Sequence, residues 1–221
     1  MIKLTRLDIP DELRARIEQR AARLRELIED GDDPPKALLD SYRDPELKAH
    51  LVAEAHGKCV YCESKITHVY FGDIEHIKPK SRFPAERLNP ENLALACALC
   101  NNAKSDFWEE AAPLLNPYID DLDQEILALG YLIARRPGRN RARLTIDQLE
   151  LNRQALLERR RERIELLQPL ADQYILEPSS GIKDLLRSEL CRQAGEDGEY
   201  AIIVRAYLEA ACDLCCFPRP D

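Results

Sequence analysis

The stretch GDIEHIKPKSRF, residues 72–83, places an acid and an imidazole, Glu75 and His76, side by side between two isoleucines. Three cations follow directly: Lys78, Lys80 and Arg82. The apolar, β-branched runs at residues 65–72 and 73–77 predict two short strands joined by a tight turn. A buried core histidine is the simplest interpretation of His76, so the flanking sequence has to decide its role.

Two CxxC pairs bracket this stretch: Cys59 with Cys62, and Cys97 with Cys100. Zn²⁺ prefers four ligands in a tetrahedron, and a CxxC turn brings two thiolates onto one ion at about 2.3 Å each. Two such pairs fill the coordination shell, so the sequence predicts a structural zinc site with no position left for substrate. Buried apolar cysteines that pair by chance are the alternative.

Four further cysteines lie near the end of the sequence: Cys191, Cys212, Cys215 and Cys216. Cys212 and Cys215 form a third CxxC, but no histidine lies nearby, so we expect buried helix cysteines here rather than a second metal site. The sequence shows no apolar leader, and thiols stay reduced in the cytosol, so a disulfide framework is not expected.

The composition is that of a globular protein, with 221 residues, 45% of them hydrophobic and 33% charged. No apolar run reaches about 18 residues, so we expect a cytoplasmic protein with no membrane partner. The net charge of −8 taken alone argues against a nucleic-acid partner. Residues 131–165, however, hold ten Arg against five Asp or Glu. This basic island would suit a phosphate-facing surface, or a solvated helix laced with Arg–Glu pairs.

Apolar periodicity predicts a mainly helical chain on either side of the cysteine pairs. Helices are expected over residues 11–30, twice within 31–57, over 146–152 with Thr145 as a cap, over 153–175, and beyond 182, with an extended piece at 126–136. The sequence thus divides into an N-terminal helical region (1–56), a core with the cysteine pairs (57–110) and a mainly helical C-terminal region (111–221).

The order of these features resembles the HNH, or ββα-metal, endonuclease motif. A zinc knuckle, an acid and His on a strand, Asn92 in the next loop and CNNAKSD opening a helix occur in that order within residues 57–108. The resemblance implies an α+β fold that is mostly α-helical, in which helices flank a small ββα-metal core with a four-cysteine zinc knuckle. It also implies a metal-dependent hydrolase of phosphodiester bonds in DNA.

The HNH pattern gives each polar residue an expected role. His76 is the general base, because a neutral imidazole can take a proton from water at neutral pH. Glu75 and Asn101 are the expected ligands of a catalytic Mg²⁺ or Mn²⁺ ion, since hard ions prefer oxygen donors. Asn92 is expected to bind backbone near His76 and orient the imidazole. In the alternatives, Asn92 is a turn residue and Asn101 a helix cap.

Adjacent strand residues point to opposite faces, which is a difficulty for a site that uses both Glu75 and His76. On the HNH pattern, a twisted strand end presents both side chains. Four cations are expected to contact the phosphates that flank the scissile bond: Lys78, Lys80, Arg82 and Lys104. A solvated loop is the alternative for the first three, and His68, outside the pattern, is expected to be structural.

A wider resemblance covers about residues 1–168 and rests on FGDIEHIKPKS, NLALACALCNNAKSD, NPYIDD and LTIDQLELNRQALLERRRERI. These segments are similar to the PtuB-type HNH subunits of Septu and retron-associated anti-phage defence systems. That resemblance implies an ABC/AAA-like ATPase partner of the PtuA type and a role as a nuclease effector. A non-catalytic zinc-knuckle module that binds nucleic acid or protein, and a free-standing restriction or homing nuclease, are the rival interpretations.

Overall fold

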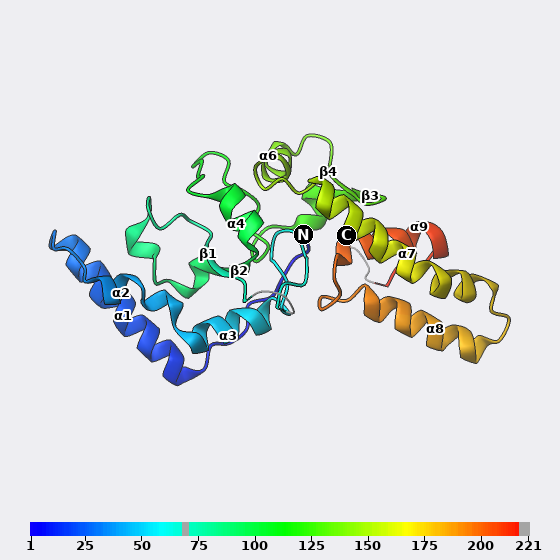
Figure 1. Cartoon of the computed structure of the whole chain (residues 1–221), viewed down its shortest axis with the longest axis horizontal. Coiled ribbons are helices and arrows are strands. Elements are labelled where there is room, and N and C mark those ends of the chain that lie inside the picture. The colour runs from blue at the N-terminus through cyan, green and yellow to red at the C-terminus, as the bar shows by residue number, and fades with distance from the viewer. Residues whose placement is uncertain (68–70, 217–221) are drawn as a thin grey trace.

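The computed structural model describes residues 1–67 and 71–216 of the chain. The described chain is mostly helical with two small two-stranded antiparallel sheets, which confirms the expected mainly helical α+β class. Figure 1 shows α1–α3 at one end of the molecule and α7–α9 at the other, with both sheets between them. The prediction for His68 falls outside the described residues.

The N-terminal region forms the expected helices: α1 (Asp11–Glu29), α2 (Lys36–Leu39) and α3 (Pro45–Glu54), with a 3-10 turn η1 (Ser41–Arg43) between the last two. Helix α1 buries one apolar stripe at helical spacing, formed by Leu13, Ile17, Ala21, Leu24 and Leu27. The Asp44 side chain caps α3 by accepting a hydrogen bond from the Glu46 backbone N–H at 3.0 Å.

The ββα unit consists of β1 (Asp73–His76), β2 (Leu93–Ala96) and α4 (Ala98–Lys104), with 3-10 turns η2 (Pro84–Glu86) and η3 (Pro90–Asn92) between the strands. The strands pair antiparallel, with Ile74 opposite Leu95 and Glu75 opposite Ala94. The described residues of the expected partner strand form no strand: Lys65 makes an isolated bridge to Lys58, and β2 pairs with β1 instead, while residues 68–70 of that prediction lie outside the described residues. All four residues of β2 are buried, so this strand lacks the alternation that would have predicted it.

The C-terminal region begins with α5 (Leu122–Glu125) and a hairpin of β3 (Ile126–Leu129) and β4 (Leu132–Arg135), where an extended piece was expected. The helices α6 (Asn140–Gln148), α7 (Gln154–Leu176), α8 (Ser180–Gln193) and α9 (Ala201–Cys212) follow. Thr145 is not a cap. It lies inside α6, where its hydroxyl donates to the Arg141 carbonyl and accepts from the Leu115 N–H.

One large hydrophobic cluster joins the three regions expected from the sequence. It contains Leu13 of α1, Leu95 of β2 and Ile203 of α9, while a second cluster lies among α7, α8 and α9. The segment at residues 57–110 therefore packs against both flanking regions, and its division from them as a separate domain stays a prediction. Among the described residues, no helix is long and apolar enough to cross a membrane.

Two expectations for the C-terminal region meet different outcomes. On α7, Arg159 pairs with Glu162 and Arg161 with Glu165, as the solvated-helix interpretation of the basic island requires. The expectation about disulfides was wrong, because a disulfide bond joins Cys191 of α8 to Cys216 after α9. Helix packing brings these two residues together, although 25 positions separate them in the sequence.

Candidate active site and zinc cluster

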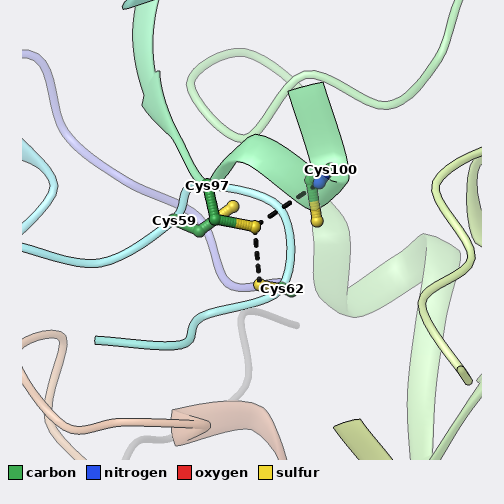
Figure 2. Close-up of side chains that lie close together, drawn as sticks. All are labelled: Cys59, Cys62, Cys97 and Cys100. Atoms are coloured by element: carbon green, nitrogen blue, oxygen red, sulfur yellow. Dashed lines mark hydrogen bonds between the residues drawn. The ribbon is translucent and has the colours of Figure 1, made fainter. Parts of the chain in front are cut away.

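The four cysteines of the two CxxC pairs meet at the start of α4 (Figure 2). Their sulfur atoms all lie within 4.8 Å of one another, and the Cys62 and Cys97 sulfurs are 3.9 Å apart. A tetrahedral zinc with bonds of about 2.3 Å places its sulfur ligands about 3.8 Å apart. The cluster therefore fits Zn²⁺, and within the described part of the chain it is the one group of three or more potential ligands found.

The local fold explains how the second pair is presented to an ion. Cys97 is the N-cap of α4, and its sulfur accepts a hydrogen bond from the Cys100 N–H at 3.4 Å (Figure 2). Arg153, just before α7, brings its guanidinium nitrogens to 3.6 and 3.7 Å from the Cys100 sulfur. The C-terminal region therefore contacts the cluster directly.

Glu75 points from β1 towards α4. Its carboxylate lies 2.6 Å from the Lys104 ammonium and accepts a hydrogen bond from the Tyr61 hydroxyl at 3.4 Å, and the side chains of Glu75 and Lys104 are 3% and 2% exposed. Burial raises the pKa of Glu75, and the Lys104 ammonium opposes this effect. The strand end therefore does not present Glu75 and His76 to one side, and the expectation that it would was wrong.

The position of Lys104 contradicts the phosphate contact expected from the sequence. Its ammonium donates to the His76 carbonyl at 2.8 Å, in addition to pairing with Glu75. A buried lysine held by a carboxylate and a carbonyl cannot reach a phosphate outside the protein. Lys104 therefore links α4 to β1. The expectation that it contacts a phosphate of the substrate was wrong.

His76 lies on the opposite side of β1, where its ring packs edge-on against Tyr42, with centroids 4.7 Å apart at 78°. Its Nε2 atom is 3.1 Å from the Arg87 carbonyl oxygen. A carbonyl only accepts, so Nε2 carries the proton and Nδ1 holds the lone pair of the neutral ring. Burial, followed by the charge of Lys80, lowers the pKa of His76 to about 3, which keeps the imidazole neutral at pH 7.

Asn92 makes the backbone contacts that its expected role requires. Its side-chain oxygen accepts from the Lys78 N–H at 2.7 Å, and its nitrogen donates to the carbonyls of Lys78 and Glu86 at 3.0 and 3.1 Å. Its own carbonyl accepts from the Ile77 N–H. Asn92 thus ties the residues after His76 to the loop that reaches Arg87, although orientation of the base by Asn92 stays a prediction.

Asn101 lies on the first turn of α4 and is not its cap, because Cys97 occupies that position. Its amide nitrogen donates to a carboxylate oxygen of Asp73 at 3.1 Å, and both residues are half-buried. Sequence reasoning missed Asp73. The signal was available, because Asp73 and Glu75 are two positions apart on a strand and share its face towards α4.

The three cations after His76 lie at different places. Lys80 donates to the Tyr42 hydroxyl at 2.9 Å, whereas Lys78 and Arg82 are exposed. The Arg82 guanidinium donates to the Trp108 carbonyl. The interpretation of all three as a solvated loop thus fails for Lys80, which is half-buried against the N-terminal region.

Tyr42 is a second residue that the sequence analysis missed. It lies in η1, and besides touching His76 its hydroxyl accepts from Lys80 and from the Arg43 Nε at 3.2 Å. Arg87, whose carbonyl holds the His76 ring, donates through Nε to the Leu39 carbonyl at 2.6 Å. No spacing rule links Tyr42 to the cysteine pairs, so only the folded chain reveals it.

Comparison with known proteins shows which proteins this chain resembles. Residues 59–107 match the family model described as HNH endonuclease. This segment is therefore similar to HNH endonucleases. Around it, 153 aligned residues are 28% identical to the Septu protein PtuB of Bacillus thuringiensis, covering 69% of this chain and 55% of that protein. A Septu protein PtuB of Bacillus mycoides (strain KBAB4) is 27% identical over 184 residues, covering 69% of this chain and 62% of the relative. The chain thus spans less than two thirds of either relative.

Proposed function

We propose that this chain is a divalent-ion-dependent HNH endonuclease that hydrolyses phosphodiester bonds in DNA. The observation that carries the proposal is His76 within the HNH domain: a neutral imidazole whose Nε2 is fixed by the Arg87 carbonyl and whose Nδ1 holds a lone pair. In the proposed reaction, Nδ1 takes a proton from the attacking water. Asn92 holds the backbone on which this ring is mounted.

A divalent ion such as Mg²⁺ or Mn²⁺ would supply positive charge for the developing charge on the phosphoryl and leaving oxygens. Its donors need to be oxygens. Asn101 and Asp73, which meet at 3.1 Å, fit that requirement, and we propose them as the first ligand pair. Glu75 does not fit as it stands, because Lys104 already neutralises its buried carboxylate.

Phosphate contacts are proposed for the cations nearest to His76. Lys80 lies beside the base through Tyr42, and Lys78 and Arg82 extend from the exposed loop that follows. Contacts of this kind supply affinity and register without selecting a sequence. The proposed substrate is therefore DNA cut with little base preference of its own.

We also propose that the protein acts as the nuclease effector of an anti-phage defence system, in the cytoplasm and together with an ATPase partner of the PtuA type. The similarity to two proteins named Septu protein PtuB supports this proposal over 69% of the chain. The helices outside residues 59–107 are the candidate surfaces for such a partner. Co-purification of the chain with the product of a neighbouring ATPase gene tests this part.

The test of the nuclease is plasmid cleavage in Mg²⁺ or Mn²⁺ by the wild-type protein and His76→Ala at equal zinc content, with and without the ATPase partner. We expect cleavage by the wild type and loss of it in His76→Ala. His56→Asn is the matched control, since His56 is 38% exposed and lies outside the HNH domain. Equal cutting by wild type and His76→Ala would refute the base assignment, and no cutting by any sample would favour the non-catalytic zinc module.

The ligand pair has its own test. Asp73→Asn should raise the concentration of Mn²⁺ needed for half-maximal cleavage, because it removes the carboxylate charge next to Asn101. If Asp73→Asn leaves that concentration unchanged while Glu75→Gln raises it without unfolding the protein, the ion binds at Glu75 and the proposed pair is wrong.

A further inference from the structure

An aromatic pair lies on the segments that follow β1 and α4, two elements that carry proposed catalytic residues. The rings of Phe83 and Trp108 meet edge-to-face, with centroids 5.2 Å apart at 73°. Both residues are half-buried, and neither belongs to the two hydrophobic clusters that the described residues form. Large aromatic side chains normally contribute most of their energy by burial in a core. Because this pair lies outside the hydrophobic clusters, core packing does not account for it.

The elements that carry the candidate catalytic residues also hold the pair in place. Trp108 comes four residues after Lys104, whose ammonium is bonded to the His76 carbonyl. Phe83 closes the turn that follows β1, and its N–H donates to the Pro79 carbonyl at 2.9 Å. Arg82 donates to the Trp108 carbonyl and so ties the two segments together. The rings are therefore anchored to the loop after β1 and to the segment after α4.

Exposed cations border the rings. The Lys78 ammonium lies 5.7 Å from the centroid of Phe83 and 6.0 Å from that of Trp108. Lys78 and Arg82 are both exposed, and Lys78 is only two residues from His76. Aromatic rings bordered by cations next to a backbone-cleaving site are the arrangement with which proteins hold single-stranded nucleic acid, stacking its bases and pairing its phosphates.

We propose that Trp108, supported by Phe83, stacks a nucleobase of an unpaired strand next to the scissile phosphate, while Lys78 and Arg82 contact the flanking phosphates. A paired base is already stacked on its neighbours and offers only its edges in the grooves. The platform therefore selects single-stranded, frayed or flipped DNA over an intact duplex. The position of the scissile bond rests on the proposed nuclease function, whereas base stacking by the rings does not.

Trp108 is the single tryptophan of the sequence, so its fluorescence reports on this site alone. The experiment titrates zinc-loaded His76→Ala protein in Mg²⁺ with a single-stranded oligo-dT, a duplex of equal length and an abasic oligonucleotide. We expect saturable quenching by oligo-dT, and at least about tenfold weaker binding of the other two. Equal quenching by all three, or none by oligo-dT, overturns the proposal.

Variants in the same background test the ring itself through the anisotropy of a labelled oligo-dT. Stacking is worth about 1–3 kcal/mol per base, so Trp108→Leu should weaken binding about 5- to 150-fold, while Trp108→Phe should retain most of it. Tyr131→Leu is the control, since Tyr131 is a 42% exposed aromatic on the β3–β4 hairpin. Trp108→Leu that binds like Tyr131→Leu overturns the proposal and shows that the rings only brace the loop.

The outcome separates the two proposals. In the wild-type background, cleavage by Trp108→Leu with unchanged preference between single strands and duplex would remove the platform and leave the nuclease in place. Quenching specific to oligo-dT in a protein that never cuts would keep the platform and remove the nuclease.

Discussion

The buried pair of Glu75 and Lys104 provides the most direct test of the site geometry. The two side chains are 3% and 2% exposed, and their charged atoms lie 2.6 Å apart. Replacing one partner leaves the other charge buried beside β1. We therefore expect Glu75→Leu and Lys104→Met to destabilise the protein strongly as single variants, and the double variant to recover most of the loss.

The magnitude follows from the distance. At 2.6 Å and an effective dielectric constant of about 20, the attraction between unit charges is about 6 kcal/mol. Desolvation costs several kcal/mol for each ion, so the net value of the pair is small, and removal of one partner typically costs about 3–5 kcal/mol. Replacement of both partners by apolar groups of similar volume is often neutral or stabilising.

The two single variants should also respond differently to pH. Burial raises the pKa of Glu75, and loss of the Lys104 ammonium raises it further. In Lys104→Met the isolated carboxyl can therefore take up a proton, so the free energy lost relative to wild type should shrink as the pH falls from 8 to 5. Glu75→Leu lacks this carboxyl and should therefore show no such recovery as the pH falls.

The assay is urea unfolding monitored by circular dichroism. The free zinc concentration is held fixed, because ligand binding shifts apparent stability. Arg143 and Asp147 on α6 are the matched control, since their side chains are 69% and 66% exposed and their removal should cost a few tenths of a kcal/mol at most. Additive losses in the double variant would refute the pair as a coupled, buried unit.

Three further expectations follow from the site. Metal analysis should find about one tightly held zinc per chain, and Cys59→Ser should lose it and unfold the segment that the cysteine pairs bracket, whereas zinc-free wild type that stays folded would contradict a structural role. Since the pKa of His76 is lowered to about 3, the unfolded chain binds the extra proton below about pH 6.5. The contribution of His76 to the free energy of unfolding is then fully present above that pH. It falls towards pH 3 by about 1.4 kcal/mol per pH unit for one proton. His76→Asn should lack this slope in urea unfolding. Tyr42→Phe keeps the ring on His76 but removes the acceptor of Lys80 and Arg43. The kcat of Tyr42→Phe in plasmid cleavage should fall less than that of Tyr42→Ala. Equal losses of kcat would show that Tyr42 acts through its hydroxyl.

The sequence predicts the long helices and the four-cysteine cluster well, because both leave strong local signals. Helix α1 repeats apolar residues at helical spacing, and α7 runs over almost the whole predicted range despite Pro169 in its interior. The two CxxC pairs specify four sulfurs through spacing alone, and the fold brings them together. These features depend on neighbours in the sequence, which sequence reasoning sees.

Tertiary packing decides the features that the sequence analysis missed. Strand β2 is buried on both faces, so it has no alternating pattern. The disulfide between Cys191 and Cys216 depends on how α8 and the end of α9 approach each other. Tyr42 reaches His76 from a 3-10 turn that lies more than thirty positions earlier in the sequence. No periodicity or spacing connects such residues before the chain folds.

Because side chains alternate along β1, Glu75 and His76 point to opposite faces of the strand and contact different parts of the molecule. The register, with Glu75 opposite Ala94, turns Glu75 towards α4, while His76 faces the turn that carries Tyr42. A shift of one residue would exchange the faces of the two side chains, so the pairing of β1 with β2 determines which of them meets α4 and which meets Tyr42.

The HNH match at residues 59–107 therefore contains His76, the proposed base, but not all of the residues that hold its ring. Tyr42 packs on the His76 ring, and the Leu39 carbonyl accepts from Arg87, whose own carbonyl holds the Nε2 atom of that ring. Both supports come from the N-terminal helical region. A base held on one side by another region is oriented only while that region is docked. Under the proposed function, we therefore expect a displacement of the N-terminal helices to change the orientation of His76.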